Sequence, residues 1–124
     1  MIEIAVNGAC GRMGARIAAL VFEYPELKLV AALERSGNQS IGKDVGLVSG
    51  VGETGIKITM TMNAHADVLI DFSSPESAVA IAEYCARKNI ALVVGTTGLT
   101  AQQHEKIQHF SRQIACLVSP NMSV

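Results

Sequence analysis

The amino-acid sequence predicts an α/β fold in which helices cover both faces of a doubly wound, mainly parallel sheet. A short apolar run, Ile2 to Asn7, leads directly into a glycine-rich turn. Apolar runs then alternate along the chain with segments of helical periodicity. Of the 124 residues, 49% are apolar, which is enough for the core of one domain and short for two. Residues 1–124 are therefore expected to form a single Rossmann-like domain.

The turn after the first strand has the composition of a phosphate-binding site. It reads Gly8-Ala9-Cys10-Gly11-Arg12-Met13-Gly14, with the spacing GxxGxxG rather than the commoner GxGxxG. A pyrophosphate needs main-chain N–H groups at the start of a helix, where aligned peptide dipoles favour negative charge. Gly8 and Gly11 are expected to permit the tight turn and the close approach, and Gly14 to let helix and strand pack closely. A tight structural turn is the alternative.

A helix and an acidic residue follow this turn. The apolar residues of the predicted helix fall on one face: Met13, Ile17, Leu20 and Val21. A second apolar run, Leu27 to Leu33, ends in Glu34, which lies 20 residues after Gly14. Dinucleotide-binding folds place the acid that accepts the ribose hydroxyls at about this distance. Glu34 is predicted to be that acid, with a surface glutamate as the alternative.

Four further apolar runs predict the remaining strands. They are residues 56–62, as a short or edge strand, and residues 66–72, 90–94 and 115–118. Between them, Ser74 is predicted to cap a helix with Pro75 at its first position. Thr100 and Gln103 match a capping box for a second helix. The predicted buried positions of these two helices are Ala78, Ile81, Ala82 and Cys85, and then Ile107, Phe110 and Ile114.

Residues 35–55 differ from the rest of the chain. They contain six of the eleven glycines, together with Ser, Asn and Gln, and few large apolar residues before Val45. This composition predicts a mobile loop.

Ligands of open parallel sheets bind across the carboxyl ends of the strands, so the residues after each strand are candidates for the site. In Phe72-Ser73-Ser74-Pro75, an aromatic ring and small polar groups are placed to flank the adenosine or the nicotinamide ribose, although helix capping explains half of this motif. In Gly95-Thr96-Thr97-Gly98, small residues allow close approach, and the hydroxyls offer hydrogen bonds to a ribose, a carboxamide or a substrate carboxylate. Ser119-Pro120-Asn121-Met122 follows the last strand.

Charge and hydropathy argue against several classes of partner. The net charge is -1 and the isoelectric point is near 6.3, which gives no broad attraction for nucleic acid or anionic lipid. Glu3 and Asn7 interrupt the first apolar run, so it does not resemble a signal peptide, and no run approaches the ~18 apolar residues of a membrane span. We therefore expect a cytoplasmic protein with no nucleic-acid or membrane partner.

The cysteines and histidines do not form a recognisable reactive or metal-binding pattern. Three cysteines cannot all pair, and reduced thiols are expected. A helix N-terminus lowers a thiol pKa, which favours Cys10 as a nucleophile, but no His or Asp is close in sequence to activate it. The histidines do not share a metal-ligand spacing, so no metal site is predicted: His65, His104 and His109.

Four motifs in order, GACGRMG, DFSSPES, VVGTTG and SPNMSV, resemble the dihydrodipicolinate reductase family, the 4-hydroxy-tetrahydrodipicolinate reductases of lysine and diaminopimelate synthesis. The resemblance covers the whole chain. It implies NADH or NADPH held by Gly8 to Met13, with Arg12 near the phosphates and Glu34 on the adenosine ribose. It also places Gly95 to Thr97 beside the nicotinamide and Ser119 to Met122 over it. Thr97 is the residue expected also to touch the substrate.

Arg35 is expected to stack on adenine or to meet a 2′-phosphate. The carboxylate of Glu34 favours NADH because it repels that phosphate, whereas the charge of Arg35 attracts it. Both cofactors are therefore expected to bind.

The resemblance also implies a second domain that forms a homotetramer and supplies the general acid and most contacts to the dicarboxylate substrate. Residues 1–124 contain no counterpart of it, so no catalytic residue is expected in this chain. The chain is predicted to be a monomeric cofactor domain that binds NAD(P)H without turnover. Two alternatives are a non-catalytic module that binds NAD(H) or CoA, and the nucleotide half of another two-domain dehydrogenase.

Overall fold

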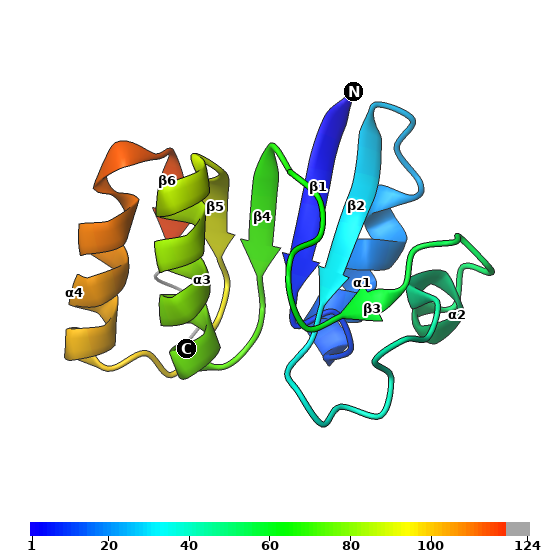
Figure 1. Cartoon of the computed structure of the whole chain (residues 1–124), viewed down its shortest axis with the longest axis horizontal. Helices are drawn as coiled ribbons and strands as arrows, with labels where there is room; N and C mark the ends of the chain where they lie inside the picture. Colours follow the sequence, from blue (N-terminus) through cyan, green and yellow to red (C-terminus); the bar gives the residue numbers. More distant parts are fainter. Residues whose placement is uncertain (119–124) are drawn as a thin grey trace.

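The computed structural model describes residues 1–118, which form a six-stranded parallel sheet in the order β3-β2-β1-β4-β5-β6 (Figure 1). The strands are β1 (Ile2–Asn7), β2 (Leu27–Leu33), β3 (Ile58–Thr59), β4 (Val68–Asp71), β5 (Ala91–Val94) and β6 (Cys116–Val118). Every neighbouring pair runs parallel. The predicted Rossmann-like, doubly wound sheet is confirmed, and β3 is the predicted short edge strand.

Helices cover the two faces of this sheet. They are α1 (Arg12–Val21), α2 (Val45–Ser49), α3 (Pro75–Lys88) and α4 (Ala101–Phe110), followed by the 3-10 turn η1 (Ser111–Gln113). In Figure 1, α3 lies in front of the sheet and α1 behind it. Two apolar clusters correspond to these faces, one including Leu69 and Ile107 and the other including Leu29 and Val45. The helix that follows β1 and the helix that follows β4 lie on opposite faces of the sheet. Open α/β sheets bind ligands at the point between two such strands.

The helix caps agree with the sequence analysis. The Ser74 hydroxyl accepts a hydrogen bond from the Ser77 N–H at 3.3 Å, and Pro75 is the first residue of α3. Thr100 and Gln103 form the predicted capping box, with bonds of 2.9 and 3.1 Å. The helix that they begin ends at Phe110. Ile114 was predicted to lie on the same helix face, and this prediction is wrong. It follows η1 in extended conformation.

The predicted apolar face of α1 is partly wrong. Met13 and Leu20 are 38% and 42% exposed, and the buried residues are Gly14, Ala18 and Val21. The helix lies so close to the glycine turn at Gly14 that a Cβ there would collide with the Gly8 carbonyl oxygen. The spacing of apolar residues along the chain does not show how closely the helix approaches the turn.

The glycine-rich stretch of residues 35–55 contains the helix α2, so the prediction of a loop throughout is wrong. Asp44 caps α2, and its carboxylate also accepts hydrogen bonds from the N–H groups of Thr54 and Gly55. The same segment covers the outer edge of β3. Gly42 donates to the Ile58 carbonyl oxygen at 2.8 Å, and the Ile58 N–H donates to Lys43 at 2.9 Å.

The longest helix of residues 1–118, α3, has 14 residues. Within that range, no helix combines the length and the apolar character that are needed to cross a membrane.

Candidate functional site

The glycine turn joins β1 to α1 with its first and last glycines in close contact with main chain. Gly8 has a φ of +84°, and a Cβ there would collide with the Phe72 carbonyl oxygen. A Cβ on Gly14 would collide with the Gly8 carbonyl oxygen. The predicted roles of Gly8 in the tight turn and of Gly14 in close packing are confirmed.

Gly11 differs from these two glycines. It is exposed, its φ is -72°, and a Cβ there would lie 3.4 Å from the nearest protein atom, the Gly8 carbonyl oxygen. Neither the backbone conformation nor the protein packing therefore requires glycine at this position. The space beside Gly11 is open to a ligand.

The main-chain N–H groups of the turn are not equally available. Those of Gly8 and Ala9 both donate to the Leu33 carbonyl oxygen at 3.0 Å, and Ala9 is fully buried. The N–H groups of Arg12 and Met13 lie in the first turn of α1, where a helix offers no internal acceptor. The main-chain N–H groups at the start of α1 are thus the donors of this turn that are best placed to bind an anion.

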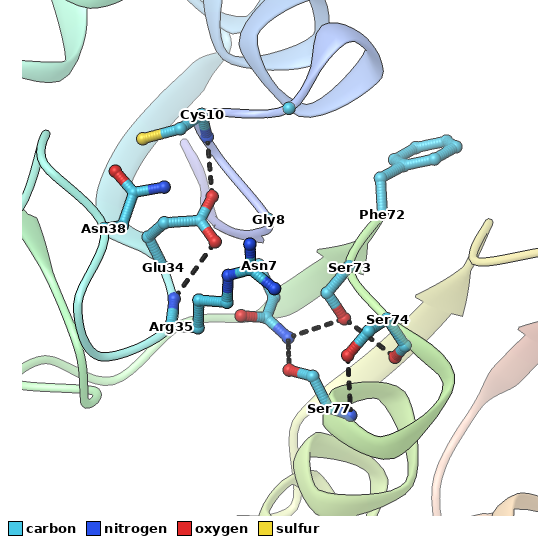
Figure 2. A pocket seen from close by; sticks show the side chains of 11 residues that line it. Asn7, Gly8, Cys10, Glu34, Arg35, Asn38, Phe72, Ser73, Ser74 and Ser77 are labelled. Atoms are coloured by element: carbon cyan, nitrogen blue, oxygen red, sulfur yellow. Dashed lines mark hydrogen bonds between the residues drawn. The ribbon is translucent and has the colours of Figure 1, made fainter.

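A pocket of about 300 Å³ opens beside this turn at the carboxyl ends of β1, β2 and β4 (Figure 2). Its lining residues are Asn7, Gly8, Cys10, Gly11, Glu34, Arg35, Asn38, Phe72, Ser73, Ser74 and Ser77. In Figure 2, Glu34 and Asn38 lie on one side, and the serines from the start of α3 lie on the other. The turn, the predicted ribose acid and the segment after β4 therefore meet at one site.

The Glu34 carboxylate is fixed by two main-chain donors. Oε2 accepts from the Cys10 N–H at 3.0 Å, and Oε1 accepts from the Arg35 N–H at 3.0 Å (Figure 2). A carboxylate oxygen can accept more than one hydrogen bond, so each oxygen retains capacity for a further donor. The structure thus orients an acceptor pair at the pocket beside the turn.

The two arginines singled out from the sequence take different positions. Arg35 is exposed, and it lines both this pocket and the neighbouring one. Arg12 is the exposed first residue of α1 and does not line either pocket.

The neighbouring pocket is predominantly apolar and was not found from the sequence. Besides the residues that it shares with the first pocket, it is lined by Leu33, Met60, Met62, Ile81 and Tyr84, among others. The signal was available in part, because Met60 and Met62 end the run that predicted β3. Their approach to α3 depends on the sheet order, which the sequence does not show.

A third pocket lies at the ends of β4 and β5. Its lining is Met13, Phe72, Ser73, Gly95, Thr96 and Thr97. A Cβ on Gly95 would collide with the Phe72 ring in its present position, so the absence of a side chain lets the ring pack against this backbone. The exposed position of Met13 places its side chain at this pocket and not in the core.

Thr96 and Thr97 differ in what their hydroxyls can do. Thr96 is 7% exposed; its hydroxyl donates to the Asp71 carboxylate and accepts from the Ser73 N–H at 2.8 Å. Thr97 is exposed at the same pocket. Thr97 is therefore the better placed of the two to donate to a ligand. The predicted site residues Ser119, Pro120, Asn121 and Met122 lie outside the described residues.

A buried polar cluster beneath the first and third pockets was missed in the sequence. Asp71 is fully buried, and its Oδ1 accepts from the Asn7 amide at 2.9 Å and from the Ser73 hydroxyl at 2.6 Å. The Asn7 amide also donates to the Ser77 hydroxyl at 3.0 Å. Burial raises the pKa of Asp71, although the hydrogen bonds that it accepts lower it in part. The available signal was a polar residue at the end of an apolar run.

The cysteine environment does not favour a nucleophile. Burial raises the pKa of the Cys10 thiol, which reduces the thiolate fraction near neutral pH. Within residues 1–118, no three His, Cys, Asp or Glu side chains lie close enough to hold a metal ion.

The comparison with known families shows which family the chain belongs to. A family model described as "Dihydrodipicolinate reductase, N-terminus" matches residues 2–122. The chain belongs to the dihydrodipicolinate reductase family. The resemblance carried by the four sequence motifs is thereby confirmed.

Named relatives of this reductase family agree. The 4-hydroxy-tetrahydrodipicolinate reductase of Geotalea daltonii is 40% identical over an alignment of 127 residues, which covers 100% of this chain and 48% of the relative. That of Nitrosospira multiformis is 42% identical over an alignment of 126 residues, which covers 99% of this chain and 46% of the relative. The chain thus spans about half the length of the curated reductases that it matches.

A solved reductase structure shares the fold. The dipicolinate-bound dihydrodipicolinate reductase from Paenisporosarcina sp. TG-14 has a TM-score of 0.71 at 24% identity. The match covers 98% of this chain and 48% of that chain.

Proposed function

We propose that this chain is the dinucleotide-binding half of a 4-hydroxy-tetrahydrodipicolinate reductase and that it holds NADH or NADPH at the carboxyl edge of its sheet. The position of Glu34 carries this proposal. Its carboxylate lies 3.0 Å from the Cys10 N–H of the glycine turn and lines the same pocket. A ribose-binding acid beside a pyrophosphate turn is the arrangement that a dinucleotide needs. The reductase names of the relatives support it.

The residues present fit the adenosine and pyrophosphate parts of such a cofactor. The open space at Gly11 and the N–H groups of Arg12 and Met13, in the first turn of α1, suit the pyrophosphate. Each oxygen of Glu34 retains capacity to accept from a ribose hydroxyl. The apolar pocket next to it, bordered by Arg35, suits the adenine base.

The third pocket is assigned to the nicotinamide end. Phe72 and Gly95 shape it, and Thr96 and Thr97 complete its wall. Ser119, Pro120, Asn121 and Met122 are proposed to contribute to binding of the nicotinamide end. The exposed Thr97 hydroxyl is proposed to contact the cyclic dicarboxylate substrate as well.

The bound nicotinamide would supply the hydride that reduces this dicarboxylate in the diaminopimelate route to lysine. The residues of this chain bind the cofactor, orient it and present its reactive end at the carboxyl ends of β4 and β5. In the whole reductase, a second domain is proposed to give the proton, to make most substrate contacts and to form a homotetramer. Residues 1–124 are accordingly proposed to act as a monomeric, cytoplasmic cofactor domain that does not turn over substrate alone.

Calorimetric titration with NADH and NADPH, followed by dipicolinate, tests this function. Binding of either reduced nucleotide with weak or absent dipicolinate binding is the expected result. A folded chain that binds neither nucleotide would contradict the proposal and favour CoA or another nucleotide as the ligand.

A further inference from the structure

The loop after β5 is held by one residue of the neighbouring strand. Residues 95–97 have no helix or strand structure, yet they form a wall of the third pocket. The Asp71 carbonyl oxygen accepts from the Gly95 N–H at 2.7 Å, and the Asp71 carboxylate accepts from the Thr96 hydroxyl. Asp71 therefore fixes two successive residues of this loop, one through its main chain and one through its side chain.

The Thr96 hydroxyl has a single favourable orientation in this arrangement. Its oxygen accepts from the Ser73 N–H at 2.8 Å, so its hydrogen is directed to Asp71 Oδ2. This one hydroxyl joins the β5 loop to the segment that begins α3. Thr97 follows directly, and the direction in which it projects depends on where Thr96 is held.

Asp71 is suited to this role because all its side-chain partners are donors. Its carboxylate accepts from Asn7 at the end of β1, from Ser73 after β4 and from Thr96 after β5. Asparagine offers one acceptor oxygen and one donor NH₂ group, so it would face either the Asn7 amide or the Thr96 hydroxyl with a donor in place of an acceptor. A carboxylate satisfies all three.

We propose that Asp71 is a positioning residue for the nicotinamide half of the site, where it acts through Thr96 to fix the Gly95–Thr97 backbone and thereby Thr97. This inference rests on the proposed function. The adenosine half has a different foundation, because Glu34 is oriented by the N–H groups of Cys10 and Arg35. The two halves should therefore respond differently when the Thr96 hydroxyl is removed.

Titration with NADH and with ADP-ribose, which lacks the nicotinamide ring, separates the two halves. Thr96→Val keeps the branched shape and removes the hydroxyl. We expect it to weaken NADH binding about tenfold and to change ADP-ribose binding less than about twofold. Thr96→Ser keeps the hydroxyl and should bind NADH within about threefold of the parent chain. Equal losses for both ligands in Thr96→Val, or no loss of NADH affinity, would overturn the inference.

A double-mutant cycle tests whether Asp71 acts through Thr96. Asp71→Asn combined with Thr96→Val should lose no more NADH affinity than the more damaging single variant, because both remove the same link. Multiplicative losses would mean that the two residues act separately, which contradicts the proposal. Asp67 is an exposed aspartate just before the same strand. Asp67→Asn is therefore the matched control and should bind NADH like the parent.

Two further outcomes concern a variant that does not fold and a parent chain that does not bind. If Asp71→Asn does not fold, the Thr96→Val and Thr96→Ser pair still tests the step on which the inference depends, because unchanged NADH affinity in Thr96→Val overturns it. If the folded parent chain binds neither NADH nor ADP-ribose, the proposed function fails, and with it the premise of the inference.

Discussion

The Gly8 carbonyl oxygen occupies the space that a Cβ on Gly14 would need, whereas a Cβ on Gly11 would lie 3.4 Å from the same oxygen. Two glycines of one turn are thus present for different reasons. Gly14 is required by the packing of α1 on the turn. Gly11 is not required by the protein itself, and its missing side chain leaves room for a ligand.

Alanine at each position should separate folding from binding. Gly14→Ala is expected to lower the free energy of unfolding by about 1–3 kcal/mol, because main chain must move to admit the methyl group. Gly11→Ala should change it by less than about 1 kcal/mol and yet weaken NADH binding at least tenfold, on the order of 1.4 kcal/mol. Urea unfolding and calorimetric titration measure the two effects. Equal destabilisation by both substitutions would disprove this assignment.

Glu34 and Arg35 should control the choice between NADH and NADPH. Glu34→Gln removes the charge that repels a 2′-phosphate and weakens the acceptor for the ribose hydroxyls. We expect its NADH affinity to fall about tenfold and its NADPH affinity to fall less. Arg35→Ala should lose NADPH affinity about tenfold and NADH affinity only a few-fold.

Arg112→Ala is the control for this pair, because Arg112 is exposed on η1. It should bind both nucleotides like the parent chain in the same titrations. An Arg35→Ala chain that binds NADPH as tightly as the parent would refute the role given to Arg35.

Asp44 should contribute to the acid sensitivity of the fold. Burial raises its pKa, but donors from Gly55, Thr54 and Gly46 more than offset this, and the pKa falls from 3.8 to about 2. A carboxyl whose pKa is lower in the folded state contributes stability above about pH 4 and loses it as the pH falls towards 2. Asp44→Asn should therefore be less stable at neutral pH and show a flatter decline between pH 4 and 2.

Urea unfolding at a series of pH values measures this effect, with Asp67→Asn as the control for the same chemical change. If the stability curves of the parent and Asp44→Asn run parallel below pH 4, Asp44 does not have this role.

Asp71 should shift stability with the opposite sign. Burial raises its pKa, so the folded chain takes up a proton at a higher pH than the unfolded chain does. Stability from this residue therefore increases as the pH falls through the folded pKa towards about 4. Burial raises the pKa of the neighbouring Cys85 thiol to about 12, so Cys85 stays protonated throughout.

Subtracting the unfolding free energy of Asp71→Asn from that of the parent isolates this contribution. The difference should grow as the pH is lowered from 7 to 4. A difference that stays constant, or that shrinks, over this range would show that Asp71 does not titrate as described.

Local patterns were enough to predict much of this fold. The strands ending at Asn7 and Leu33, the caps at Ser74 and Thr100, and the acid at Glu34 all follow from residues close together in the sequence. Helix α2 was missed because five residues are too few to establish a period. Its N-terminus is capped by Asp44, which also bonds Thr54 and Gly55 on the far side of a loop.

The buried cluster could not be predicted in the same way. Asn7 and Asp71 are 64 residues apart and meet because β1 pairs with β4, so that both strands end at the same level. In the sequence, each of them is only a polar residue at the end of an apolar run. Only the order of strands in the sheet shows that one satisfies the other, and that Thr96 completes the cluster.

The segment that covers β3 has a further consequence, for the solubility of the protein. Edge strands with free main-chain groups invite pairing with other chains and aggregation. Here Ile58 offers neither its N–H nor its carbonyl oxygen outward, because Lys43 and Gly42 already bond to them. Residues 42–45 thereby prevent a strand of a neighbouring molecule from pairing with β3 at this edge.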